Sequence, residues 1–244
     1  MEALILAAGF GSRLLKPLNK KPKSLLKIGK KTILYYLIEK IKKTKIKKIH
    51  VVVGFKKELI INYLIKNFSN KIEFNFINNK SYKTKGNIYS LYLAENFIKQ
   101  DLVIFNSDIV LPNNMLNKFI TNPQKNLFLT NKKKFINHDD ILFLCKKKNI
   151  VKNVFVKEVK KNTKKLAPSA GVVKMEKKTI KSLLSIIKKM NLNEVMYYES
   201  GYQELIRKFK FKIYPARKKI IEIDTKKDYQ NIKETISLDK SYTC

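Results

Sequence analysis

Short apolar runs and helical periodicities alternate along the first half of the chain. Residues 3–7 are apolar and lead to a glycine turn, as is typical of a buried strand. Residues 49–53 are largely β-branched and end at Gly54, a pattern that favours a buried parallel strand. The same reasoning predicts two further strands, over residues 72–77 and 102–105.

Helices are expected between these strands, where apolar residues recur three and four positions apart. This spacing predicts helices over residues 33–41, 59–68 and 87–97. Asn87 is expected to cap the third of them, and Pro112 fits the first turn of another helix. Strands that alternate with helices predict an α/β fold with a Rossmann-like, mostly parallel sheet and helices on both faces.

The pattern changes after about residue 125. Apolar runs then follow one another without helices between them, which predicts a mixed or antiparallel part of the sheet. Two helices are expected next, at about 178–190 and 197–208, and a closing helix over 226–235. The strands predicted in this part lie over residues 127–130, 141–146, 151–156, 171–174, 211–214 and 220–223.

The ends of the predicted parallel strands carry residues suited to binding. Gly9, Gly54 and Asp108 each follow an apolar strand, and Gly11 comes two positions after Gly9. Ligands of parallel α/β sheets bind at the carboxyl ends of the strands. Glycine at such a turn lets a ligand approach the backbone closely. The sequence therefore predicts one binding rim that these residues share.

Two cations follow the turn at Gly9 and Gly11. Arg13 comes two positions after Gly11, and Lys23 ten positions after Arg13. Backbone N–H groups together with fixed cations favour a polyphosphate ligand. The segment lacks the Gly-Lys-Ser/Thr ending of a Walker A loop, and Leu14 stands where a dinucleotide fingerprint needs its third glycine. A phosphate loop of another kind is therefore expected.

The composition is strongly basic. Lys and Arg number 53 against 19 Asp and Glu, which gives a formal net charge of +34. Such a charge ordinarily suggests nucleic acid or an anionic membrane as a partner. However, only Arg13, Arg207 and Arg217 are arginines, and base readout and bidentate phosphate binding favour Arg. We interpret the charge as codon bias of an AT-rich genome, with steering of anionic nucleotides as the alternative, and expect no nucleic-acid partner.

Length, cysteines and hydropathy set further limits. The chain has 244 residues, 44% of them apolar, which is enough for a substantial core. Cys145 and Cys244 lie far apart and outside any metal-binding spacing, which fits a reducing compartment. No apolar run reaches the length of a membrane span, and no signal-peptide pattern precedes the first strand. We therefore expect a cytoplasmic location and no membrane span.

The N-terminal string is more specific than any single glycine. Leu-Ala-Ala-Gly-x-Gly-Ser-Arg-Leu at residues 6–14, followed by Pro-Lys-Ser-Leu-Leu at 22–26, resembles the signature of the nucleotidyltransferases that make NDP-sugars and CDP-alcohols. The resemblance covers nearly the full length. It implies the nucleotide-diphospho-sugar transferase fold as a single domain over residues 1–244. About 1–125 would bind the nucleotide, and about 126–244 would form a small acceptor-binding lobe with a closing segment.

The resemblance also implies roles for the matching residues. Arg13 and Lys23 would be catalytic, with Lys23 on the α-phosphate. Asp108 and Asp224 would hold Mg²⁺, which offsets the repulsion between two phosphate anions. An aspartate at a strand end is otherwise a common cap or turn former. The nucleotide would lie against Leu6, Ala7, Ala8, Gly9, Gly11, Ser12, Gly54, Asn87, Ser90 and Asp108, and the acceptor against Lys157, Tyr198, Glu199 and Glu222.

Within this family the chain is most similar to phosphocholine cytidylyltransferase-like enzymes. The segments that carry this likeness are Asn-Ile-Tyr-Ser-Leu from Asn87, Tyr197-Tyr198-Glu199 and Ile-Glu-Ile-Asp-Thr from Ile221. The implied reaction joins CMP from CTP to a small phosphorylated alcohol or phosphonate with release of pyrophosphate. It would serve surface polysaccharide or lipid decoration, in a monomer or homodimer.

The class of acceptor is inferred from positions where the sequence differs from the phosphocholine enzymes. Two alternative functions are also considered. The chain has no Trp, the best cation–π partner for a quaternary ammonium, and residues 137–140 are polar and acidic. These features favour an amine-bearing, amino-acid-like or hydroxylated acceptor over choline. A sugar-1-phosphate nucleotidyltransferase that uses UTP, dTTP or GTP is the main alternative. A non-catalytic relative is another, although Arg13, Lys23, Asp108 and Asp224 are all present.

Overall fold

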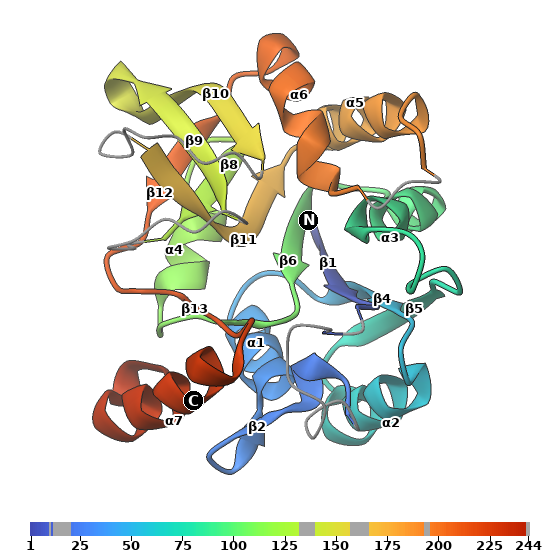
Figure 1. Ribbon diagram of the computed structural model, residues 1–244, viewed down its shortest axis with the longest axis vertical. Helices are drawn as coiled ribbons and strands as arrows, with labels where there is room; N and C mark the ends of the chain where they lie inside the picture. Colours follow the sequence, from blue (N-terminus) through green and yellow to red (C-terminus); the bar gives the residue numbers. More distant parts are fainter. Residues whose placement is uncertain (10, 12–20, 132–139, 157–165, 193–195, 243–244) are drawn as a thin grey trace.

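The computed structural model describes residues 1–9, 11, 21–131, 140–156, 166–192 and 196–242. Within these residues a nine-stranded sheet runs through the molecule in the order β5-β4-β1-β6-β11-β8-β12-β10-β9, with helices on both faces (Figure 1). Its strands are β1 (Glu2–Ala7), β4 (Lys48–Val53), β5 (Glu73–Asn78), β6 (Leu102–Asn106), β8 (Leu127–Thr130), β9 (Ile141–Lys146), β10 (Ile150–Val156), β11 (Leu166–Met175) and β12 (Lys212–Pro215).

Helices and two small sheets complete the architecture. The small sheets pair β2 (Lys27–Ile28) with β3 (Lys31–Thr32) and β7 (Ile109–Val110) with β13 (Ile221–Glu222). The α-helices are α1 (Ile33–Lys42), α2 (Lys57–Phe68), α3 (Asn87–Leu93), α4 (Met115–Thr121), α5 (Lys177–Lys188), α6 (Tyr202–Lys208) and α7 (Lys226–Leu238). Short 3₁₀ helices are η2 (Lys23–Leu25), η3 (Glu95–Phe97), η4 (Lys147–Asn149), η5 (Tyr198–Gly201) and η6 (Lys240–Tyr242).

The two halves of the sheet differ in strand direction, as the sequence predicts. β5, β4, β1 and β6 are parallel neighbours, and Ile5 at the centre of β1 pairs with Val51 on one side and Phe105 on the other. Beyond β6 the sheet becomes mixed, because β11 runs antiparallel to both β6 and β8 while β12 runs parallel to β8. The predicted α/β fold with a mostly parallel but mixed sheet is confirmed.

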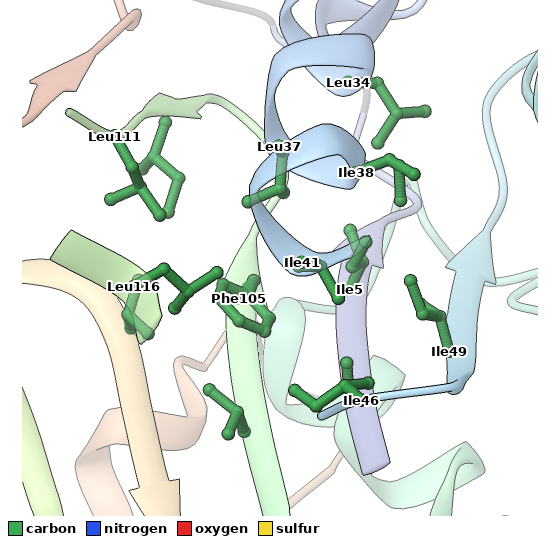
Figure 2. Close-up of a cluster of buried hydrophobic side chains, with 14 of the residues drawn as sticks. Ile5, Leu34, Leu37, Ile38, Ile41, Ile46, Ile49, Phe105, Leu111 and Leu116 are labelled. Carbon is green, nitrogen blue, oxygen red and sulfur yellow. The ribbon is translucent and has the colours of Figure 1, made fainter. Parts of the chain in front are cut away.

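Alternation along β1 divides the core between the two faces of the sheet. Ala3, Ile5 and Ala7 belong to the cluster under α1, α2 and α4, whereas Leu4 belongs to the cluster under α3, α5 and α6. Figure 2 shows α1 laid over the sheet, with its apolar side chains above Ile5 and Phe105. Each fully buried side chain of this size stabilises the fold by about 1.5–3 kcal/mol. This packing fixes the strand ends that carry the site.

Two local predictions are wrong. Asn87 is the first residue of α3 rather than its cap, because Gly86 occupies the extended capping position. Pro112 lies before α4 rather than in its first turn. That helix begins only at Met115, because Asn114 has the left-handed φ of 59° and interrupts the helical backbone. Among the residues described, no helix is both long enough and apolar enough to cross a membrane.

Candidate active site

A cavity of about 330 Å³ opens at the carboxyl ends of the parallel strands. The end of β1, the residue after β5 and the end of β6 all contribute to its wall. Its lining consists of Leu6, Ala7, Ala8, Gly9, Gly11, Lys23, Ser24, Asn79, Tyr82, Lys85, Gly86, Asn87, Ser90, Asn106, Ser107, Asp108, Tyr197 and Asp224. The predicted rim is therefore a real cavity, and residues from positions 6 to 224 meet in it.

Three charged side chains, Lys23, Asp108 and Asp224, form what we call the charged end of this cavity. The Lys23 Nζ lies 2.6 Å from Asp108 Oδ2 and 2.7 Å from Asp224 Oδ1. The side chains of Lys23, Asp108 and Asp224 are 14%, 23% and 31% exposed, respectively. Two carboxylates separated by more than one hundred residues thus share one cation at a partly buried position.

The backbone around the charged end explains how these groups meet. Lys23 begins η2, which Pro22 introduces with an extended backbone. The small sheet of β7 and β13 brings the other two together, and the Ile223 N–H donates to the Asp108 carbonyl oxygen at 3.1 Å. A capping box at the start of α7, between Thr225 and Asp228, then fixes the chain directly after Asp224.

The charged end consists of ion pairs whose protein partners could be replaced by the charged groups of a ligand. Burial alone lowers the pKa of Lys23, but the charges and hydrogen bonds of Asp108 and Asp224 outweigh burial and raise it. The carboxylate pair is thus already arranged around a cation. In the described part of the chain no group of three or more His, Cys, Asp or Glu side chains could hold a metal ion. Mg²⁺ usually keeps several waters and substrate oxygens, so two carboxylates are a fitting protein contribution.

The opposite wall, formed by Asn79, Asn87 and Ser90, is what we call the neutral end. The Asn79 Nδ2 donates to Ser90 Oγ at 3.0 Å, and both side chains are buried. The Asn79 Oδ1 accepts from the Ser81 N–H at 2.9 Å, so this amide is fixed on both sides. Tyr82 lines the cavity beside it. The side chains of Asn79, Asn87 and Ser90 offer polar groups without formal charge, and Lys85 from the same part of the chain also lines the cavity.

Most predicted nucleotide-binding residues lie on the cavity, and their roles remain predictions. Gly54 is an exception, because it lies behind the wall. A Cβ atom there would stand 2.9 Å from the Ala8 carbonyl oxygen and 2.9 Å from Tyr82. Gly54 therefore allows the turn after β1 and Tyr82 to pack closely. The predicted residues on the lining are Leu6, Ala7, Ala8, Gly9, Gly11, Lys23, Asn87, Ser90, Asp108 and Asp224. Ser12, Arg13 and Lys157 lie outside the described residues.

The predicted acceptor residues that the structure describes do not line this cavity. Tyr198 is only 1% exposed and packs edge-to-face on Tyr202, with ring centroids 5.7 Å apart. Glu199 is also buried, and Glu222 pairs with Ile109 between β13 and β7. The ring of Tyr198 belongs to the core in this structure, and its role toward the acceptor stays a prediction. Its neighbour Tyr197 lines the cavity instead.

Several lining residues have no motif in the sequence. Asn79, Tyr82, Lys85 and Gly86 all come from the segment between β5 and α3. For Asn79 the signal that could have found it is a polar residue shortly after the predicted strand at 72–77, since Asp108 likewise comes shortly after the predicted strand at 102–105. Gly86 has a second role, because a Cβ atom there would lie 1.8 Å from the Met196 carbonyl oxygen. The chain before η5 thus packs directly against the start of α3.

The fold and the cavity define an α/β protein with a cation-bridged carboxylate pair at the carboxyl ends of its parallel strands. A family model described as nucleotidyl transferase matches residues 2–135. The match covers more than half of the chain, and the chain belongs to this nucleotidyl transferase family.

Curated relatives agree with this membership. Over 207 residues, 85% of this chain, it is 30% identical to the bifunctional protein GlmU of Methanococcus aeolicus, of which the match covers 47%. Over 128 residues, 49% of this chain, it is 39% identical to the CTP:phosphoglutamine cytidylyltransferase of Campylobacter jejuni, of which the match covers 48%. The matched part thus spans about half the length of these relatives.

Solved structures share the fold at low sequence identity. The CTP:phosphocholine cytidylyltransferase of Streptococcus pneumoniae superposes with a TM-score of 0.78 and 24% identity, over 96% of this chain and 98% of that one. A UDP-glucose pyrophosphorylase in complex with UDP-glucose gives a TM-score of 0.80 and 16% identity, over 97% and 98% of the two chains. The expected fold of the nucleotide-diphospho-sugar transferases is confirmed.

Proposed function

We propose that this protein is a Mg²⁺-dependent cytidylyltransferase that joins CMP from CTP to a small phosphorylated alcohol or phosphonate bearing an amine. The observation that carries the proposal is the charged end of the cavity. Lys23 bridges Asp108 and Asp224 at 2.6 and 2.7 Å, in the cavity that Gly9 and Gly11 also line. A cation between two carboxylates at the rim of a parallel sheet suits a site that must accommodate several phosphates.

In this reaction an oxygen of the acceptor phosphate attacks the α-phosphorus of the nucleotide. A new P–O bond forms there, the bond from the α-phosphorus to the bridging oxygen breaks, and pyrophosphate leaves with the electron pair. Lys23 would leave its carboxylate partners and donate to the α-phosphate, where negative charge accumulates in the transition state. Asp108 and Asp224 would hold Mg²⁺. The ion would offset the repulsion between the two anionic reactants.

The preference for CTP rests on similarity, and the neutral end suits a pyrimidine base in general. The relatives from Campylobacter jejuni and Streptococcus pneumoniae are named as cytidylyltransferases, for phosphoglutamine and for choline phosphate. Asn79, Asn87 and Ser90 offer hydrogen-bonding groups without charge, as a pyrimidine base requires. The absence of Trp and the acidic Asp140 favour a primary amine or amino-acid-like acceptor over choline. The name of the Campylobacter relative, whose acceptor carries an amino acid, supports the same choice.

Pyrophosphate release tests this proposal. We would supply Mg²⁺ and each of CTP, UTP, dTTP, ATP and GTP, and combine each nucleotide with phosphocholine, phosphoethanolamine, 2-aminoethylphosphonate, phosphorylated glutamine or glucose-1-phosphate. Release that requires CTP together with an amine-bearing phosphate or phosphonate is the expected result. Release that occurs only with glucose-1-phosphate would contradict the choice of acceptor and support the second candidate below.

A sugar-1-phosphate nucleotidyltransferase is that second candidate. It is favoured by the match to bifunctional protein GlmU, which covers 85% of this chain, more than the 49% covered by the Campylobacter cytidylyltransferase. Both candidates use the charged end in the same way, so variants of Lys23 cannot separate them. Nucleotide preference can, because a sugar enzyme of this kind would release pyrophosphate with UTP, dTTP or GTP rather than with CTP.

A further inference from the structure

A buried carboxylate lies directly behind the neutral end of the cavity. Glu199 belongs to η5, is 6% exposed, and is absent from the cavity lining. Its Oε2 accepts a hydrogen bond from Asn87 Nδ2 at 3.4 Å, and Asn87 does line the cavity. A buried carboxylate is costly unless it is hydrogen-bonded, so its retention beside a cavity residue calls for an explanation.

The hydrogen bonds around Asn87 leave one orientation for its amide. The Tyr198 backbone N–H lies 2.9 Å from Asn87 Oδ1. A backbone N–H can only donate, so the amide oxygen must face it and the amide nitrogen must face Glu199. One N–H of Asn87 is then engaged by Glu199. In the part of the chain that the structure describes, no protein group accepts from the second N–H, which leaves it as a donor for a ligand at the cavity wall.

The residues that contact Glu199 are themselves held in place by packing in the core. Burial raises the pKa of Glu199 to about 7, against the opposing effect of hydrogen bonds from its own backbone, from Asn87 and from the Tyr198 hydroxyl. Tyr198 packs in turn on Tyr202. The close contact of Gly86 with the Met196 backbone holds this segment against the start of α3. Glu199 therefore sits in a fixed frame, which is what a group that orients another requires.

We propose that Glu199 is a positioning residue for nucleotide recognition, which holds the Asn87 amide so that Asn87 donates a hydrogen bond to an acceptor atom of the nucleobase. The inference rests on the proposed function, since it assumes that the neutral end receives the base. It moves Glu199 from the acceptor side of the reaction to the nucleotide side. Its effect on a ligand is exerted through Asn87 and not by direct contact.

A double-mutant cycle on equilibrium CTP binding, with Mg²⁺ and without any acceptor, tests this inference. Glu199→Ala and Asn87→Ala should each weaken CTP binding by about 3- to 10-fold, the effect of one hydrogen bond. The double variant should bind no more weakly than Asn87→Ala alone, because the effect of Glu199 passes through that amide. Additive losses, or unchanged CTP affinity in Glu199→Ala, would overturn the inference.

Two further variants separate positioning from charge and from folding. Glu199→Gln keeps an acceptor oxygen for the Asn87 amide and should retain CTP affinity within about 2-fold. A loss as large as that of Glu199→Ala would overturn the inference in favour of a role for the charge. Glu204→Gln, on the exposed side of α6 where Glu204 pairs with Lys208 at 2.7 Å, is the matched control and should bind as the wild type does. Thermal unfolding confirms that each variant is folded.

The last measurement of the test is the KM of the acceptor substrate. At saturating CTP, Glu199→Ala should leave the KM of the acceptor found by the pyrophosphate screen unchanged. A raised acceptor KM with unchanged CTP affinity would overturn the inference and return Glu199 to the acceptor side. A wild-type protein that binds no nucleoside triphosphate would contradict the proposed function itself. Normal nucleotide binding with unaffected variants would instead contradict only the role of Glu199.

Discussion

The two ends of the cavity are held by different interactions. At the charged end, three ionised side chains meet through two ion pairs, and each keeps part of its surface open. At the neutral end, Asn79 and Ser90 bond to each other in a buried position, and Asn87 bonds to the backbone and to Glu199. The partners at the charged end can be exchanged for ligand charges, whereas those at the neutral end are fixed within the protein.

This difference predicts a division of labour. Groups that change partners during a reaction can stabilise its transition state more than its ground state, and they raise kcat. Groups that contact parts of the ligand away from the reacting phosphorus bind the ground state and the transition state alike, and they contribute to uniform binding and to the choice of ligand. We therefore expect changes at Lys23, Asp108 and Asp224 to lower kcat, and changes at Asn87 and its support to raise the dissociation constant for the nucleotide.

The largest effect is expected from Asp108→Asn. The substitution keeps the shape of the side chain but removes one of the two carboxylates that would hold Mg²⁺, so turnover should fall below detection. The melting temperature should stay close to that of the wild type, because Asp224 still pairs with Lys23. Pyrophosphate release and thermal unfolding measure the two quantities. Normal turnover in this variant would contradict the assignment of the metal site.

Lys23→Ala should lower kcat by about 10²- to 10³-fold, the usual effect of removing one donor to the charge of a transition state. The measurement is steady-state pyrophosphate release over a range of CTP concentrations. Lys27→Ala is the matched control, because this exposed side chain lies four residues along the same segment. If Lys23→Ala instead raised KM and left kcat unchanged, Lys23 would be a uniform binder and the division between the two ends would fail.

Two glycine substitutions separate the packing behind the cavity wall from binding in the cavity. Gly86→Ala places a methyl group against the Met196 carbonyl oxygen and should reduce the free energy of unfolding by about 2–3 kcal/mol. Gly9→Ala meets nothing within 4 Å and should leave stability unchanged, but it narrows the cavity and should weaken nucleotide binding. Denaturant unfolding and CTP titration measure these quantities. Equal stability of the two variants would contradict the packing argument.

The smallest effect is a pH dependence from Glu199. Its pKa in the folded protein is about 7, above the usual 4.5, so its stabilising contribution is complete below about pH 4.5 and is lost as pH rises to about 7. Glu199→Gln removes this dependence. The stability of the variant relative to the wild type should therefore rise between pH 5 and pH 8, by on the order of 1–3 kcal/mol. A difference that does not vary with pH would contradict the buried carboxylate.

The charged end was predictable from sequence, and so were Asn87 and Ser90 of the neutral end, whereas Asn79 was not. Asp108 and Asp224 follow apolar strands, and Lys23 stands in a recognisable string, so position along the chain identifies them. Asn79 and Tyr82 come from a segment without a motif, and tertiary contacts such as the hydrogen bond from Asn79 to Ser90 of α3 bring this segment to the cavity. Neighbouring strand ends can be inferred from topology, but the path of a connecting segment depends on its tertiary contacts.

Tyr197 and Tyr198 show that tertiary contacts also decide which of two adjacent side chains reaches the cavity. Tyr197 lines the cavity and Tyr198 is buried, yet the sequence offers no means to tell which of two adjacent rings faces inward. A 3₁₀ turn begins between them, so their side chains leave the backbone in different directions. The prediction of Asn87 as a helix cap failed in a similar way, because the sequence does not show which of two adjacent residues takes the capping position. Gly86 takes the capping position, and that leaves the Asn87 side chain to contact the segment that begins η5.

Phosphorus NMR of the reaction products tests the central claim most directly. With Mg²⁺, CTP and the acceptor found by the pyrophosphate screen, the wild-type protein should form pyrophosphate and one new diphosphate-linked cytidine product in equal amounts. That result requires attack at the α-phosphorus, as the charged end is proposed to promote. Formation of cytidine diphosphate and inorganic phosphate would instead place the bond cleavage between the β- and γ-phosphates, and it would contradict nucleotidyl transfer at this site.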